Sequence, residues 1–239
     1  MRRLLAALAF LTRVPIPLAF DAADVGRATL LFPLVGALLG LGSFAVARAA
    51  HRFPASIVAV VVVAFSALLT GGLHLDGVVD SADGFGGGKT RDDVLRIMKD
   101  HAIGAYGAIA LIFVIAMKLA CTAQLLDEWR ILVLAPLLSR WASVPLCRAL
   151  PNARPSGLGK ALSDHVGALE IVGATLFTSV ASWALGGWRG AVCMGAVTLS
   201  TILGALVCAR RIGGITGDTL GANTELGEIV TYLVWLACA

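Results

Sequence analysis

Long apolar runs divide the chain and decide what it can fold into. At about 1.5 Å per residue, a helix needs roughly 20 apolar residues to cross a bilayer. Six runs are near that length: 28–47, 55–73, 103–126, 131–150, 166–187 and 190–209. A seventh run, 229–239, is short for a full span, so six and seven spans both fit. We therefore predict an all-α, polytopic membrane helical bundle that forms one domain over residues 1–239.

The composition agrees with this fold class and excludes others. Hydrophobic residues make up 58% and charged residues 14% of the 239 positions, and the mean hydropathy is +0.88, as in polytopic membrane proteins. The net charge of +4 is not gathered in a basic patch with interleaved aromatic residues, so nucleic acid is not an expected partner. The five cysteines lie in apolar runs without a C-x-x-C pair, which indicates small apolar core residues.

The N-terminal segment 1–20 is predicted to lie at the membrane surface. Two arginines precede a short apolar run, a pattern typical of an interfacial helix. Pro15 and Pro17 follow and break this helix, because proline has no backbone N–H to donate. The lipid bilayer is therefore an expected partner of this segment as well as of the spans.

Two features inside the apolar runs predict how the helices pack. Gly36 and Gly40 form a G-x-x-x-G pattern, which lets a neighbouring helix approach closely. Lys118 and Arg140 lie within runs, and a cation at mid-membrane costs about 2.5–3.5 kcal/mol on insertion scales. Each is therefore expected to face the bundle interior or a wet cavity. Lys118 either pairs with a carboxylate or extends to the membrane surface.

An acidic stretch, 70–107, interrupts the apolar runs and holds six of the 15 carboxylates. On a helix, at about 100° per residue, the side chains of Asp76, Asp80 and Asp83 would share one face. Carboxylates that close repel one another, and a divalent cation relieves the repulsion. Mg²⁺ prefers one or two carboxylates together with substrate phosphate oxygens. We therefore expect these three residues to hold Mg²⁺; a solvated acidic loop is the alternative.

A second polar stretch, 210–228, combines five glycines with Arg210, Arg211, Asp218 and Glu225. Glycine-rich backbone beside cations suits the binding of phosphate oxygens. An ordinary connecting loop is the alternative interpretation.

The distribution of cations predicts which ends of the spans face the cytoplasm. With alternating spans, both polar stretches and the loop 151–164 share one face with the N-terminus. Of the 19 lysines and arginines, thirteen fall on this face: Arg2, Arg3, Arg13, Arg27, Lys89, Arg91, Arg96, Lys99, Arg148, Arg154, Lys160, Arg210 and Arg211. The opposite face has four: Arg48, Arg52, Arg130 and Arg189. The bias predicts that the polar stretches are cytoplasmic.

Carboxylates that hold a metal, with arginines on neighbouring loops, make a site for a diphosphate. The metal and the arginines would stabilise charge while a phosphoryl-linked group moves to an alcohol. A spare carboxylate or His74 could accept the proton of that alcohol. For His74, a hydrogen bond at a helix end is the alternative role.

At these residues the sequence resembles the cobalamin synthase family, whose activity is adenosylcobinamide-GDP ribazoletransferase. The resemblance covers nearly the whole chain and is strongest in its polar segments. The matching segments are Phe10–Pro15, Phe32–Gly36, Thr70–Gly77, Asp80–Gly84, Ile97–Asp100, Ile103–Gly107, Ser139–Trp141, Ala153–Pro155, Gly157–Gly159 and Gly213–Ala222. His101 and Ala102 depart from the pattern, which has a small residue and then a cation there, so no phosphate contact from a cation at position 102 is expected here.

The resemblance implies a reaction, a cofactor and a set of site residues. The enzyme would join adenosylcobinamide-GDP to α-ribazole or α-ribazole 5′-phosphate and release GMP. It would use Mg²⁺ on Asp76, Asp80 and Asp83, and it would lie in the bacterial inner membrane. Further substrate-binding candidates are Lys99, Asp100, Arg140, Arg154, Arg210, Arg211, Thr216, Asp218 and Glu225.

Two other functions remain open at this point, and so does the oligomeric state, monomer or homo-oligomer. One is a different metal-dependent membrane transferase, such as a CDP-alcohol phosphotransferase or a prenyltransferase. The CDP-alcohol pattern continues with Ala-Arg, whereas Asp76-Gly77 leads here to Val79-Asp80. The other is a cation transporter, which needs carboxylates at mid-bilayer on broken helices. Here the carboxylates follow the end of a span, which favours an enzyme.

Overall fold

The computed structural model describes residues 1–238, and its described part is helical almost throughout, which confirms the predicted all-α class. Only Ala239, the end of the predicted domain and of its last run, lies outside the described residues. The elements are α1 (Arg2–Leu11), α2 (Ala22–Ala28), the short 3-10 helix η1 (Thr29–Leu31), α3 (Phe32–Ala49), α4 (Ala55–Thr70), α5 (Leu73–Gly87), α6 (Arg91–Ile97), α7 (Ala105–Leu125), α8 (Trp129–Ala149), α9 (Leu158–Ser163), α10 (Ala168–Ile212) and α11 (Gly217–Ala237).

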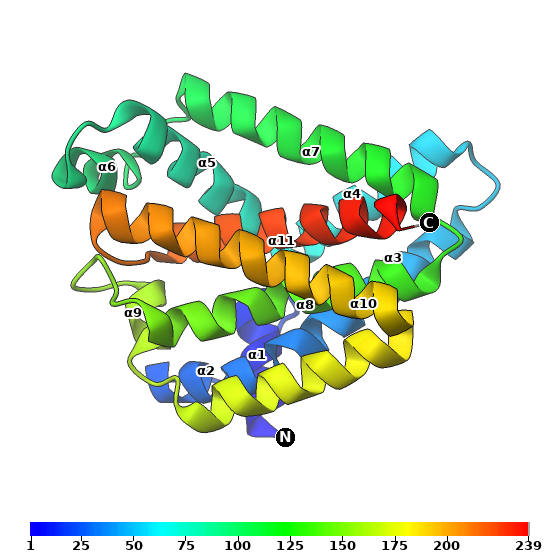
Figure 1. Ribbon diagram of the computed structural model, residues 1–239, viewed down its shortest axis with the longest axis horizontal. Coiled ribbons are helices and arrows are strands. Elements are labelled where there is room, and N and C mark those ends of the chain that lie inside the picture. The colour runs from blue at the N-terminus through cyan, green and yellow to red at the C-terminus, as the bar shows by residue number, and fades with distance from the viewer. Residues whose placement is uncertain (239) are drawn as a thin grey trace.

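Several helices are long and apolar enough to cross a membrane. Four segments meet that description within the described residues: 22–49, α7, α8 and α10; α4 and α5, bent by 88°, would together make a fifth. The 45-residue α10 is interrupted at Gly187, whose φ of 56° and ψ of −133° are not helical. Figure 1 shows its two arms running in opposite directions from this turn. The break expected between runs 166–187 and 190–209 is thus confirmed.

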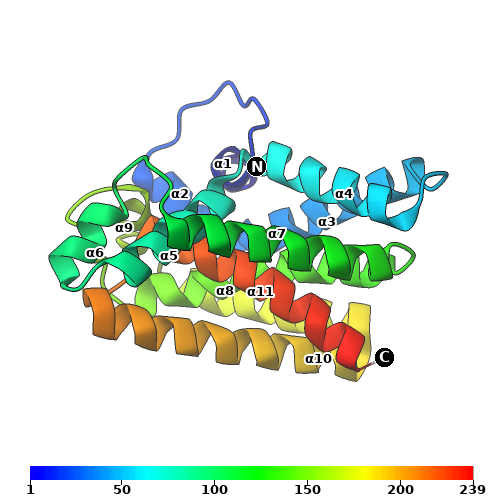
Figure 2. The ribbon, with the colours of Figure 1, turned by 90° about the horizontal axis from the view of Figure 1, so that it is seen from above.

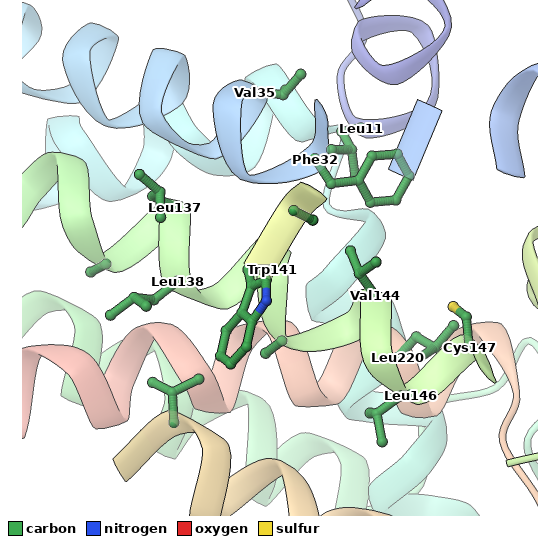
Figure 3. Close-up of a cluster of buried hydrophobic side chains, with 14 of the residues drawn as sticks. Leu11, Phe32, Val35, Leu137, Leu138, Trp141, Val144, Leu146, Cys147 and Leu220 are labelled. Atoms are coloured by element: carbon green, nitrogen blue, oxygen red, sulfur yellow. The ribbon is translucent and has the colours of Figure 1, made fainter. Parts of the chain in front are cut away.

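Helix α8 lies at the centre of the bundle. It packs against α3, α10 and α11, and most of its side chains are buried. Figure 3 shows Leu137, Leu138 and Trp141 of α8 in this core. Added Cβ atoms at Gly36 and Gly40 of α3 would collide with the α8 backbone, so these glycines permit the close helix contact that their spacing predicts.

The turn between α4 and α5 sets the direction of the acidic helix. Gly71 and Gly72 both have left-handed backbone, with φ of 65° and 69°. Side chains with a Cβ are strained there, so two consecutive glycines allow the sharp bend. Helix α5 then carries Asp76, Asp80 and Asp83 towards the end of the bundle that holds α6 and α9, as Figure 2 shows from above.

Two boundaries differ from the sequence-based expectation. The polar stretch 210–228 is mostly helical: α10 continues to Ile212, and α11 begins at Gly217. The apolar run 229–239 is therefore no separate element, because its described part is the second half of α11. Polar residues at the start of α11 hid this helix from a search for apolar runs. The break after α1 is confirmed, since residues 12–21 are not helical.

Candidate active site

The site is built where α5 and α11 cross. A Cβ added at Gly77 of α5 would lie 2.5 Å from the backbone oxygen of Asp218. One added at Gly221 of α11 would lie 3.3 Å from the Cα of His74. Only small residues allow this approach, and it brings the polar start of α5 against the polar start of α11.

Three carboxylates meet at this crossing. Asp76 is exposed, while Asp80 and Asp218 are half-buried. The negative charges of Asp76 and Asp218 both act on Asp80. Arg154 compensates part of this repulsion, because its Nη2 lies 2.8 Å from Oδ2 of Asp218. One cation against three carboxylates leaves a net negative site that would attract a cation.

Backbone pairing holds the Arg154 loop beside the start of α11. Ala153 N–H donates to the oxygen of Ile215 over 2.7 Å, and Ile215 N–H donates to the oxygen of Pro151 over 2.9 Å. Arg91 ties both segments to α6, since its guanidinium donates to the backbone oxygens of Ile212 and Ala153. The three polar segments therefore converge at one end of the bundle (Figure 1).

A cavity of about 260 Å³ opens at this end. Its polar lining comes mainly from α5, the loop after α8 and the start of α11, and includes Asp76, Arg154 and Asp218. Its apolar lining comes from α1, α3, α8 and α9. Figure 3 shows Leu11 and Phe32 across from Val144 and Cys147, four of these lining side chains.

Four polar side chains of the lining have buried nitrogen atoms without a hydrogen-bond partner among the described residues: His74, Arg140, Asn152 and Arg154. Of these four residues, only His74 and Arg140 are themselves buried. His74 is 6% and Arg140 is 2% exposed. Within the described part of the chain, His74 Nδ1 and Arg140 Nε have no hydrogen-bond partner. Buried polar atoms are normally satisfied, so these two nitrogens indicate a ligand group or water in the cavity.

A buried ionic network lies behind Arg140. Its Nη1 donates to Glu228 Oε2 and to Ser139 Oγ, over 2.8 and 2.9 Å. Lys118 Nζ lies 2.8 Å from Glu225 and 3.1 Å from Glu228. The two cations and two carboxylates balance one another inside the bundle. Of the two alternatives for Lys118, the structure shows the carboxylate pair.

The sequence of this chain is similar to those of known proteins. A family model described as "Cobalamin-5-phosphate synthase" matches residues 3–236. The chain belongs to this family. Three proteins named adenosylcobinamide-GDP ribazoletransferase illustrate the relationship: one from Geotalea daltonii is 36% identical over 99% of this chain and 98% of its own. Those from Acinetobacter baumannii and Pseudomonas aeruginosa are 38% and 37% identical, with at least 95% of each chain covered. No solved structure matches.

In this member of the cobalamin-5-phosphate synthase family, Asp83 acts electrostatically on Asp80 but has hydrogen-bond partners of its own at the start of α7. Its Oδ2 accepts the N–H of Gly104 and its Oδ1 accepts the N–H of Gly107, each over 2.8 Å. The carboxylate thus caps the first turn of α7, with both oxygens engaged. Among the described residues, no group of three His, Cys, Asp or Glu side chains is arranged to hold a metal ion by itself.

The remaining predicted residues lie outside the cavity lining. Lys99, Asp100 and Arg210 are exposed. Arg211 donates to the backbone oxygens of Phe85 and Gly88, at the C-terminal end of α5. Thr216 caps α11, since its hydroxyl accepts the N–H of Thr219 over 3.2 Å, and Glu225 belongs to the buried network. The structure therefore brings together Asp76, Asp80, Asp218, Arg154, His74 and Arg140.

Sequence reasoning missed several residues of the site. Asn152, Ser143 and Thr224 line the cavity, as does Phe10. Ser143 and Thr224 lie in apolar or mixed helices, where a hydroxyl normally bonds to its own backbone, so their type gives no signal. Phe10 and Asn152 fall in or beside segments that carry the family resemblance, which was the only available indication.

Proposed function

We propose that the chain is an adenosylcobinamide-GDP ribazoletransferase that joins adenosylcobinamide-GDP to α-ribazole or its 5′-phosphate, the last assembly step of cobalamin. The observation that carries the proposal is the group of Asp76, Asp80 and Asp218 with Arg154 at the edge of the cavity. The relatives support it, since they bear this name over nearly the full length of the chain. The other transferases and the transporter considered above are not what these relatives are named for.

The reaction is a displacement at phosphorus. A hydroxyl oxygen of the ribazole attacks the phosphorus that carries the cobinamide alcohol, the bond from this phosphorus to the bridging oxygen breaks, and GMP leaves with that oxygen. Arg154 binds a phosphate oxygen and stabilises the charge that develops there. His74, or a carboxylate of the group, accepts the proton of the attacking hydroxyl.

The carboxylate group suits Mg²⁺ because it offers only oxygen ligands and carries uncompensated negative charge. Asp76, Asp80 and Asp218 would hold the ion together with the phosphate oxygens of adenosylcobinamide-GDP. When bound, the ion supplies charge neutralisation at the phosphates. Asp83 has the different task of fixing α7 against α5, so it supports the site without touching the ion.

The proposed location is the bacterial inner membrane, with the site at the cytoplasmic ends of the spans. Six crossings result when the segment 22–49, α7, α8, the two arms of α10 and α11 are each counted as one span. The bent pair of α4 and α5 would make a seventh crossing. Reporter fusions at Lys89, Lys160 and Gly217 test the orientation. An outward-facing signal at any of these positions would contradict it, because the three segments form one site.

Product formation tests the activity itself. Purified protein in lipid nanodiscs is incubated with adenosylcobinamide-GDP, α-ribazole and Mg²⁺, and the products are identified by chromatography and mass spectrometry. We expect adenosylcobalamin and an equal amount of GMP, and we expect both products to be lost in Asp76→Asn and Asp80→Asn at ordinary Mg²⁺ concentrations. GMP without cobalamin would indicate a hydrolase, and neither product would refute the proposal.

A further inference from the structure

We propose that the cavity of about 260 Å³ is the pocket of the acceptor nucleoside, and that the corrinoid of the donor stays outside it. The inference rests on the proposed function and names which substrate enters. The acceptor, α-ribazole, is a flat two-ring aromatic base on a ribose. The donor is a corrin ring with long side chains and a nucleoside diphosphate.

The size of the cavity separates the two substrates. Pockets for drug-sized molecules have volumes of roughly 300–1,000 Å³. The present cavity, at about 260 Å³, holds a small nucleoside but not a corrinoid many times larger. Only the diphosphate end of the donor can reach Asp76, Arg154 and Asp218, which lie on the polar side of the lining.

The apolar lining fits a flat aromatic base. Phe10 and Phe32 both line the cavity, and their rings are stacked, with centroids 5.6 Å apart and planes inclined by 14°. Leu11, Val144 and Leu162 complete this wall. Aromatic and aliphatic side chains bind such a base through stacking and burial of apolar surface. A phosphate or a corrin amide would gain nothing from this wall.

The unpartnered nitrogens fit the polar atoms of the same ligand. The two-ring base of α-ribazole is a benzimidazole, and its one free ring nitrogen accepts a hydrogen bond. Arg140 Nε–H is a buried hydrogen-bond donor without a partner among the described residues. Glu228 and Ser139 hold the other end of this guanidinium, so its direction is fixed. His74 Nδ1 remains for a ribose hydroxyl. An acceptor whose base is buried here presents its ribose to the carboxylates at the edge.

Binding to the unmodified protein is the first test. Isothermal titration of α-ribazole into protein in nanodiscs, without donor or Mg²⁺, should show one site. A riboside of an azidobenzimidazole should photolabel α1, α3 or α8, and excess α-ribazole should prevent the labelling. Labelling confined to other segments, or binding that requires the donor, would overturn the inference. Both measurements are independent of turnover, so they can fail while the product assay succeeds, and the reverse.

Substitutions of the wall give a second test. Val144→Phe should fill the cavity and raise KM for α-ribazole about tenfold or more, while KM for adenosylcobinamide-GDP changes less than about twofold. Phe10→Leu, a milder change, should raise the same KM by a smaller factor. Val180→Phe is the matched control, because Val180 is exposed on α10. Equal increases for both substrates in the two wall variants, or an increase for the donor alone, would contradict the assignment.

Discussion

The guanidinium of Arg154 and the carboxylate of Asp218 lie 2.8 Å apart, with side chains only 16% and 20% exposed. The pair joins the loop after α8 to the start of α11, two segments that are far apart in the sequence. Since both residues line the cavity, the same contact that closes this end of the bundle also provides the cation of the site.

Arg154→Ala should therefore impair use of the donor more than any other arginine substitution at this end of the bundle. Loss of a charge-assisted contact to phosphate costs about 1.5–3 kcal/mol, which corresponds to roughly ten- to a hundredfold in KM for adenosylcobinamide-GDP. Steady-state kinetics with each substrate varied would measure this. Arg210→Ala is the control, because Arg210 is exposed and outside the cavity. The same loss in both variants would remove Arg154 from the phosphate site.

Gly77→Ala should separate α5 from α11 and abolish activity. The added Cβ meets a backbone oxygen, which cannot rotate away, at 2.5 Å. Alanine is otherwise favoured over glycine in helices by about 1 kcal/mol, so the loss would come from the contact alone. Gly87→Ala on the same helix is the control, since its Cβ would meet only Ile97 at an ordinary 3.4 Å. Product assays of both variants decide; activity retained in Gly77→Ala would mean that the crossing tolerates a wider spacing.

The sequence predicts the helices well but the loops less well. Apolar runs identify α4, α7 and α8 to within a few residues, because burial in lipid needs an uninterrupted apolar segment. The start of α11 is missed for the opposite reason: this turn faces the site, so it is polar and glycine-rich, as a loop would be.

Site membership was harder to predict than secondary structure. Helical spacing alone groups Asp76, Asp80 and Asp83. In the structure, the N-terminus of α7 donates hydrogen bonds to Asp83, and Asp218, from a helix far away in the sequence, joins Asp76 and Asp80. Arg211 follows the same logic, since backbone oxygens of the α5 end accept its hydrogen bonds. The spacing of residues along one helix cannot reveal such partners, because the partners depend on which helices cross.

Asp83→Asn should reduce stability rather than change the response to Mg²⁺. An amide offers one oxygen acceptor where the carboxylate offers two, so one buried N–H of α7 is left unsatisfied, at a cost of about 1–3 kcal/mol. Asp80→Asn should behave in the opposite way, with little change in stability and a shifted Mg²⁺ requirement. Thermal unfolding and Mg²⁺ titration of activity, measured on both variants, distinguish the two roles. A raised Mg²⁺ requirement in Asp83→Asn at unchanged stability would return Asp83 to the metal.

The buried network behind the cavity provides the last prediction, because it separates charge balance from binding. Glu228→Gln leaves Arg140 and Lys118 with one carboxylate, Glu225, and should lower the free energy of unfolding by about 3–5 kcal/mol. Asp127→Asn, which removes an exposed pair with Arg48, is the control and should cost at most about 1 kcal/mol.

The double variant Arg140→Met/Glu228→Leu removes one charge of each sign and leaves Lys118 with Glu225. Replacing a buried ion pair by apolar side chains of similar size is often neutral for stability, so much of the loss should be recovered. The double variant should nevertheless fail to bind α-ribazole, since the N–H that Arg140 Nε would donate to the base is gone. Unfolding in detergent and titration in nanodiscs would measure the two effects separately. Recovery of both would show that Arg140 serves the fold alone, and recovery of neither would show that the shape of the network matters more than its charge.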